Sequence, residues 1–119
     1  MTIKTHRAGH TSIAELISDE MIVRTVDDGL DLLGNLFFQG FDKVIIHGKN
    51  ITPGFFDLKT GIAGDILQKF TNYRVRLAIV GDFAEVPGKS LRDFIFESNK
   101  GKQVNFVNSA AEAIETLSR

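Results

Sequence analysis

Short apolar runs alternate with amphipathic stretches along most of the chain. The runs within 43–47, 74–80 and 103–107 predict strands, and the second is almost continuously apolar, as is typical of a strand covered on both faces. Apolar residues at helical spacing predict helices over 25–40, 60–70 and 90–100 and from Ser109 onward, with one further helical turn near 53–57. Two short strands at 2–6 and 11–17 flank a predicted hairpin turn.

Polar residues at the expected helix ends support the helix boundaries. Thr25 is followed three residues later by Asp28, and Ser109 has the same spacing to Glu112, so both are predicted N-caps with capping boxes. On the first helix we predict an apolar face made of Val26, Leu30, Leu33 and Phe37. Gly29 and Gly34 weaken a helix, so their presence predicts close packing against a neighbouring element.

The resulting order is β-β-α-β-α-β-α-β-α. Alternation of this kind predicts an α/β fold in which helices cover the faces of a mainly parallel five-stranded sheet. The hairpin supplies an antiparallel N-terminal edge. With 119 residues and no linker or repeat, residues 1–119 are expected to form one domain.

Composition narrows the classes of function. The formal net charge is −1, which gives no electrostatic reason to expect a nucleic acid or an anionic membrane as partner. The chain contains no cysteine, and no apolar run approaches the length needed to cross a bilayer. We therefore expect a cytoplasmic protein.

Polar residues gather where the parallel strands and the next helix are expected to meet. Ligands of open α/β sheets commonly bind beyond the carboxyl ends of the strands, and a helix start favours anions. The alternative is that these residues only cap and turn the chain, as in any α/β protein. The candidate binding residues are His47, Lys49, Asn50, Asp57, Lys59, Thr60, Gly61, Asp82 and Arg92.

His47 is the only histidine expected near that edge. As a general base it needs an orienting partner, and Asp82 is the candidate if the two strands are neighbours. The alternative is a strand-end histidine bonded to a backbone carbonyl. His6, His10 and His47 lack metal-ligand spacing, so we expect no metal and no cofactor. No recognised catalytic motif occurs, so catalytic residues are not assigned.

Three aromatic features need a second contact surface. Phe96 points away from the apolar stripe of its helix, and Phe37-Phe38 and Phe55-Phe56 are adjacent pairs that cannot share one helix face. Such rings are either covered by a neighbouring loop or part of an association surface. A homodimer through exposed Phe residues follows as a prediction.

Nearly the whole chain resembles the bacterial domain of unknown function 4180 family. The phrases that carry this resemblance are HGKNITPGFFDLKTGIAGDILQKF, YRVRLAIVGDF and KSLRDFIFESNKG. The resemblance implies no established activity.

A more distant resemblance is to STAS domains, the fold of anti-sigma-factor antagonists. Those families open a helix with Asp-Ser-Ser/Thr-Gly-Leu, and residues 56–62 read FDLKTGI. The resemblance implies a STAS-like fold and a phosphosite at Thr60, directly before Gly61. One extra residue separates Asp57 from that glycine, and Ile46-His47-Gly48 replaces the usual acidic strand end.

Two hypotheses follow for function. The first is a non-catalytic regulatory or binding module that engages a partner protein or a small anionic ligand at the helix start near Thr60. The alternative is an enzyme or ligand-binding protein with a strand-end pocket around His47 and Asp82. A flat surface at this edge favours the first, and a concavity with a displaced pKa favours the second.

Overall fold

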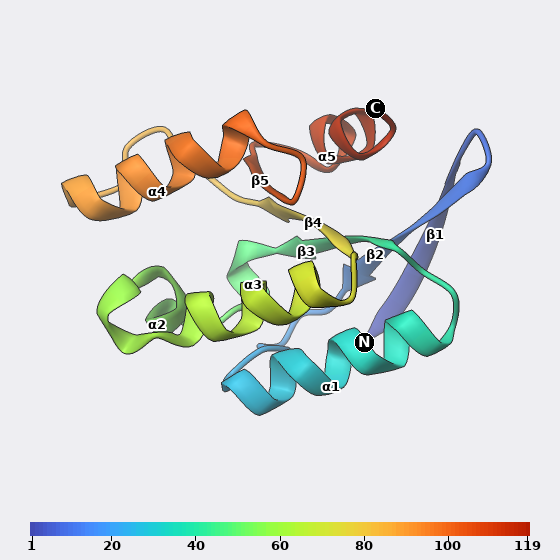
Figure 1. Cartoon of the computed structure of the whole chain (residues 1–119), viewed down its shortest axis with the longest axis horizontal. Helices are drawn as coiled ribbons and strands as arrows, with labels where there is room; N and C mark the ends of the chain where they lie inside the picture. The colour runs from blue at the N-terminus through green and yellow to red at the C-terminus, as the bar shows by residue number, and fades with distance from the viewer.

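A five-stranded mixed sheet forms the centre of the molecule (Figure 1). The structure is a computed structural model that describes residues 1–119, apart from the side chain of Ala8. The strands lie in the order β1-β2-β3-β4-β5, with β1 and β2 antiparallel and the remaining pairs parallel. They are β1 (Thr2–Ala8), β2 (Thr11–Ile17), β3 (Lys43–His47), β4 (Arg76–Val80) and β5 (Val104–Val107). The predicted α/β sheet with an antiparallel edge hairpin is confirmed.

Helices cover both faces of this sheet unequally. They are α1 (Val26–Phe38), α2 (Pro53–Phe56), α3 (Ile62–Asn72), α4 (Lys89–Lys100) and α5 (Ala110–Leu117), with 3-10 turns η1 (Gly48–Asn50) and η2 (Leu58–Thr60). The larger core lies between one sheet face and helices α1, α3 and α4, whereas α5 alone packs on the other face. Helices α1 and α3 lie side by side, and the β1–β2 hairpin extends beyond the helices (Figure 1).

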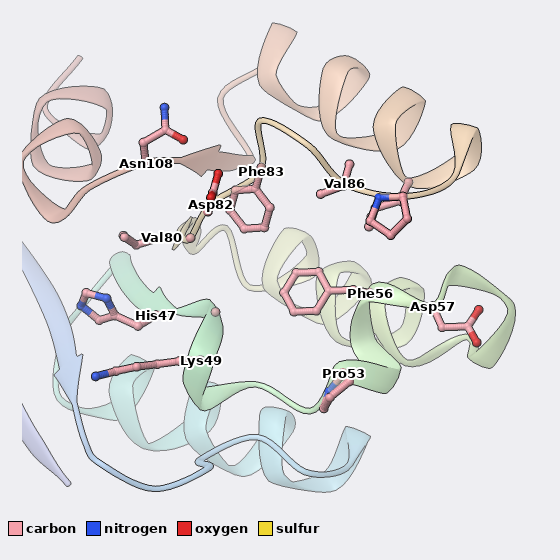
Figure 2. A pocket seen from close by; sticks show the side chains of 14 residues that line it. His47, Lys49, Pro53, Phe56, Asp57, Val80, Asp82, Phe83, Val86 and Asn108 are labelled. Carbon is pink, nitrogen blue, oxygen red and sulfur yellow. The ribbon is translucent and has the colours of Figure 1, made fainter.

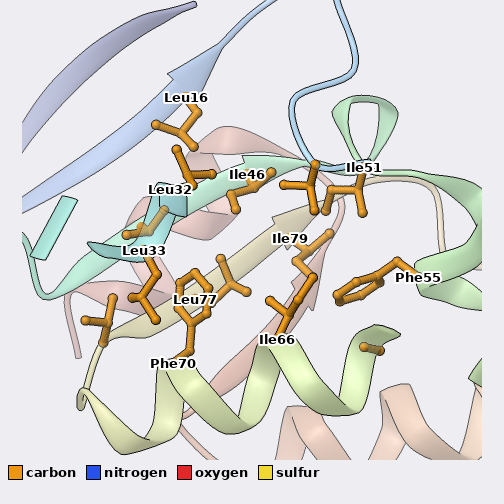
Figure 3. Close-up of a cluster of buried hydrophobic side chains, with 14 of the residues drawn as sticks. Leu16, Leu32, Leu33, Ile46, Ile51, Phe55, Ile66, Phe70, Leu77 and Ile79 are labelled. Atoms are coloured by element: carbon orange, nitrogen blue, oxygen red, sulfur yellow. The ribbon is translucent and has the colours of Figure 1, made fainter. Parts of the chain in front are cut away.

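Successive side chains of each strand point alternately into the two cores of the protein. In β3, Val44 and Ile46 join the larger core and Ile45 joins the smaller one. Because successive side chains of a strand point to opposite faces, the apolar run of β3 is buried on both sides. Figure 3 shows Ile66 and Phe70 of α3 packed against the larger-core face of the sheet.

The predicted apolar face of α1 is partly wrong. Leu33 is buried, but Phe37 is 50 % exposed. The face that packs inward consists of Gly29, Leu32, Leu33 and Leu36. This stripe has helical spacing as well, and it is selected because Gly29 lets α1 approach Ile66 of α3 closely.

Gly29 and Gly34 offer a matched test of this helix contact. A Cβ on Gly29 would lie 2.8 Å from Cδ1 of the buried Ile66, whereas a Cβ on Gly34 meets no atom within 4 Å among the described residues. We expect Gly29→Ala to lower the free energy of unfolding by about 1–3 kcal/mol through overpacking. Gly34→Ala should raise it by up to about 1 kcal/mol through helix propensity. Urea denaturation measures both, and an equal effect of the two changes would contradict the close helix contact.

The start of α3 differs from the prediction. The helix begins at Ile62 after Gly61, whose φ of 78° is in the left-handed region that glycine adopts most easily. Thr60 precedes this N-cap in η2, and its hydroxyl oxygen lies 2.7 Å from the carbonyl oxygen of Gly54 and 2.9 Å from that of Asp57, so its one hydrogen is shared between them. The same oxygen accepts the N–H of Ile62 at 3.2 Å. Thr60 therefore closes the corner between α2 and α3 and supports the first residue of the helix from outside it.

A cleft at the carboxyl edge of the sheet

A cleft of about 770 Å³ opens at the carboxyl ends of β3, β4 and β5 (Figure 2). Strand ends, α2 and the loop between β4 and α4 contribute its walls. The lining residues are His47, Gly48, Lys49, Pro53, Phe56, Asp57, Val80, Gly81, Asp82, Phe83, Val86, Pro87, Leu91 and Asn108. The volume and the mixture of apolar walls with a few polar groups are those of a small-molecule site.

The cleft has a polar end and an apolar end. Figure 2 shows His47, Lys49 and Asn108 toward one end, and Phe56 and Val86 toward the other. Aromatic packing forms the apolar end. The ring centroids of Phe56 and Phe83 are 6.0 Å apart, and the ring of Phe83 packs edge-on against the ring of Phe106. Tilted and edge-to-face ring pairs at these distances are favourable contacts that stabilise this wall of the cleft.

His47 at the polar end belongs to a three-residue cluster with Glu15 and His6. Nε2 of His47 lies 2.7 Å from Oε2 of Glu15, and Nε2 of His6 lies 2.8 Å from Oε1 of the same carboxylate. Glu15 is only 5 % exposed. Each oxygen of this buried carboxylate is therefore occupied by one imidazole.

Strand register brings these three residues together. Glu15 in β2 pairs with Ile45 of β3 and with Lys4 of β1, so His47 and His6 each stand two residues from a direct partner of Glu15. Residues two apart on a strand share one face, and diagonal neighbours across strands are within reach of long side chains. All three side chains consequently meet on the face that carries α5.

The Glu15 carboxylate is ionised near neutral pH. Burial alone would raise the pKa of Glu15, but hydrogen bonds and charge interactions with His47 and His6 bring that pKa below its usual value. An ionised carboxylate has no hydrogen to donate. Nε2 of both histidines must therefore carry the hydrogen, which leaves Nδ1 as the ring nitrogen of His47 with no partner among the described residues.

The cleft collects four of the residues predicted from the sequence. His47, Lys49, Asp57 and Asp82 all line it. Asp82 does not orient His47 as expected: its Oδ1 accepts a hydrogen bond from the backbone of Ala84 at 3.3 Å, and Glu15 takes the orienting role. Strands β3 and β4 are neighbours as the prediction required, but Asp82 turns into its own loop.

The other predicted residues lie outside the cleft. Asn50 is 1 % exposed, and its side-chain amide donates to the carbonyls of Ser18 at 2.9 Å and Glu20 at 2.7 Å. Arg92 donates to the carbonyl of Val86 at 3.4 Å and so supports the loop that forms one wall. The remaining residues, Lys59, Thr60 and Gly61, belong to the corner before α3.

Sequence reasoning missed Glu15, His6, Phe56, Phe83 and Asn108 as site residues. The one available signal for Glu15 was an acidic residue within the apolar run of a predicted strand. His6 and His47 each face their own oxygen of Glu15, and among the described residues no group of three or more His, Cys, Asp or Glu is arranged to hold a metal ion. None of the described helices is long and apolar enough to span a membrane.

The fold and the cleft together define a small α/β domain with a ligand-sized cavity at the carboxyl edge of its sheet. The profile of the family described as Domain of unknown function (DUF4180) matches residues 8–117. The chain belongs to this family. No curated protein and no solved structure matches it significantly.

Proposed function

We propose that this domain, a cytoplasmic protein, binds a small molecule in the carboxyl-edge cleft. The observation that carries the proposal is the cleft itself, with the imidazole of His47 hydrogen-bonded to Glu15 at one end and packed aromatic rings at the other. The expected ligand has an apolar body that contacts Phe56 and Val86. Its polar head would face His47 and Lys49.

Filling the cleft tests this function. Val86 lines the cavity, whereas Ala84 is an exposed residue of the same loop that does not line it. We expect native mass spectrometry of protein from its own host to show a small-molecule adduct on wild type and on Ala84→Trp. In Val86→Trp the occupancy should fall at least about tenfold, because the new ring occupies the apolar end of the cleft. A wild type without adduct, or equal occupancy in the two variants, would contradict the proposal.

A second candidate is a regulatory role for the Thr60 corner, in line with the STAS-like pattern of residues 56–62. Thr60 is exposed, and its hydroxyl ties Gly54 to Asp57, a residue of the cleft rim. A phosphate on Thr60 would remove this donor and add charge. The corner would then open and move one wall of the cleft.

Substitutions at Thr60 separate this role from simple support of the corner. Thr60→Glu is expected to lower the free energy of unfolding by about 1 kcal/mol and to change the affinity for a ligand or partner protein. Thr60→Ser keeps the hydroxyl and serves as the matched control. Calorimetric titration and pull-down from the native host measure both effects, and unchanged affinities in Thr60→Glu would remove the switch.

The homodimer stays a prediction. Phe38 at the end of α1 is 94 % exposed, and Phe37 beside it packs edge-on against Tyr73 with centroids 5.2 Å apart. Phe96 on α4 is 64 % exposed and lies under the ammonium of Lys100. Static light scattering at high protein concentration measures the molar mass, and the mass of a monomer would contradict the predicted homodimer.

A further inference from the structure

We propose that His47 acts as a proton acceptor toward a weakly acidic hydroxyl group of the ligand in the cleft. This inference rests on the proposed function and adds the chemical class of the ligand. It would be a molecule with an aromatic or other apolar body that carries a phenolic or enolic O–H. The geometry behind it is an imidazole in the cleft wall whose inner nitrogen is bonded to a buried carboxylate.

The hydrogen-bond arrangement fixes which atom of His47 can accept the proton. Nε2–H is donated to Glu15 over 2.7 Å, so a neutral imidazole presents its lone pair on Nδ1. The side chain is 23 % exposed and lines the cleft, so a ligand has access to the ring. This is the arrangement of a general base with an orienting carboxylate.

The proton transfer from the ligand to His47 needs no other reactant. The O–H bond of the ligand breaks, its electron pair stays on the ligand oxygen, and the proton forms a bond with Nδ1 of His47. The imidazolium keeps its Nε2–H bond to Glu15. Its new positive charge is then stabilised by the Glu15 carboxylate on one side and by the ligand oxyanion on the other.

His6 is a positioning residue in this cluster. Its Nε2–H occupies Oε1 of Glu15 at 2.8 Å, which holds the carboxylate plane and leaves Oε2 for His47. Without that second bond Glu15 is free to rotate, and His47 loses a fixed partner. His6 itself does not line the cleft.

The charged groups around the cluster are mostly basic. Lys4 is the β1 residue directly opposite Glu15, and Lys49 lies in η1, two residues after His47. Lys43 of β3 donates to Oγ1 of Thr11 at 3.1 Å. On the cleft side, Asp82 is held in its own turn and Asp57 stands toward the apolar end. Positive charge beside His47 favours a ligand anion over its neutral form.

The test uses 4-nitrophenol, a phenol whose anion has its own absorption band. Equilibrium dialysis measures binding, and the absorbance of the bound fraction measures ionisation. At a pH below the pKa of the free probe, we expect the phenolate-to-phenol ratio to be about tenfold higher for the bound probe than for the free probe, a shift of one pKa unit. His47→Gln should abolish this increase. His10→Gln, at an exposed residue of the hairpin turn, should keep it.

Two variants of the cluster test the same proton transfer independently of His47→Gln. Both Glu15→Gln and His6→Gln should reduce the phenolate increase while the probe still binds, and the larger reduction belongs to Glu15→Gln. Binding that Val86→Trp abolishes, without any change in ionisation, would overturn the proton transfer and leave the proposed function intact. Absence of cleft-dependent binding would overturn both.

Discussion

Glu15→Ala is expected to lower the free energy of unfolding by about 3 kcal/mol. The substitution removes a buried carboxylate that accepts hydrogen bonds from two imidazoles, at 2.7 Å from His47 and 2.8 Å from His6. Breaking a buried pair by removing one partner costs about 3–5 kcal/mol. The histidine side chains are 23 % and 18 % exposed, so water compensates part of this loss. Urea or thermal denaturation provides the measurement.

Two control variants show whether the loss of stability in Glu15→Ala comes from the buried cluster. Glu15→Gln keeps the shape and one acceptor oxygen, so its expected cost is only about 1 kcal/mol. Glu20→Ala removes an exposed carboxylate just after the same strand and should stay within about 0.5 kcal/mol of wild type. Equal stabilities of Glu15→Ala and Glu20→Ala would show that the cluster does not form.

The same cluster predicts a dependence of stability on pH. The folded-state pKa of Glu15 lies below its usual value, so the unfolded chain binds this proton more readily. The contribution of Glu15 to stability is therefore complete above the usual Glu range, about 4.3, and is lost as pH falls through the folded-state pKa. Wild type should lose more stability in acid than Glu15→Gln, as denaturation at several pH values would reveal.

Asn50→Ala is expected to cost about 2–4 kcal/mol. The Asn50 side chain is buried and its amide donates to the part-buried carbonyls of Ser18 and Glu20, so alanine removes the donor of two hydrogen bonds and leaves a gap in the core. Each hydrogen bond lost in this way costs about 1–2 kcal/mol. The backbone carbonyl of Asn50 also accepts from Ile22 at 2.7 Å. This residue thus anchors the segment between β2 and α1.

The stability and the ligand binding of Asn50→Ala together show whether Asn50 stabilises the fold or binds the ligand. Asn35→Ala, on the exposed side of α1, is the control and should not lose stability. Folded Asn50→Ala should still bind 4-nitrophenol in the cleft. Unchanged stability together with lost binding would instead make Asn50 the ligand residue that the sequence predicted.

The fold could be predicted because its strands and helices carry local signals. The apolar runs of β3 and β4 indicated parallel strands, and Thr25 accepts the Asp28 amide at 3.1 Å as its spacing predicted. The inward face of α1 could not be decided locally. Leu30 and Phe37 form as good a stripe as Leu32 and Leu36, and only the approach to α3 chooses between them.

From the sequence, only the site residues at the carboxyl ends of parallel strands could be predicted. His47, Lys49 and Asp82 meet in the cleft because the carboxyl ends of parallel strands share one edge. Glu15 was missed because its burial depends on long-range register. Alternation within β2 places Glu15 on the face of Ile13, but only the pairing of β1, β2 and β3 brings two imidazoles onto its carboxylate.

The most direct test of a ligand site at His47 is a crystal structure of the protein with 4-nitrophenol. We predict the ring of the probe between Phe56 and Val86 and its oxygen at a hydrogen-bond distance of about 3 Å from Nδ1 of His47. Nε2 of His47 should still contact Glu15. A probe bound elsewhere on the protein, or a His47 ring turned away from Glu15, would contradict the proposed site.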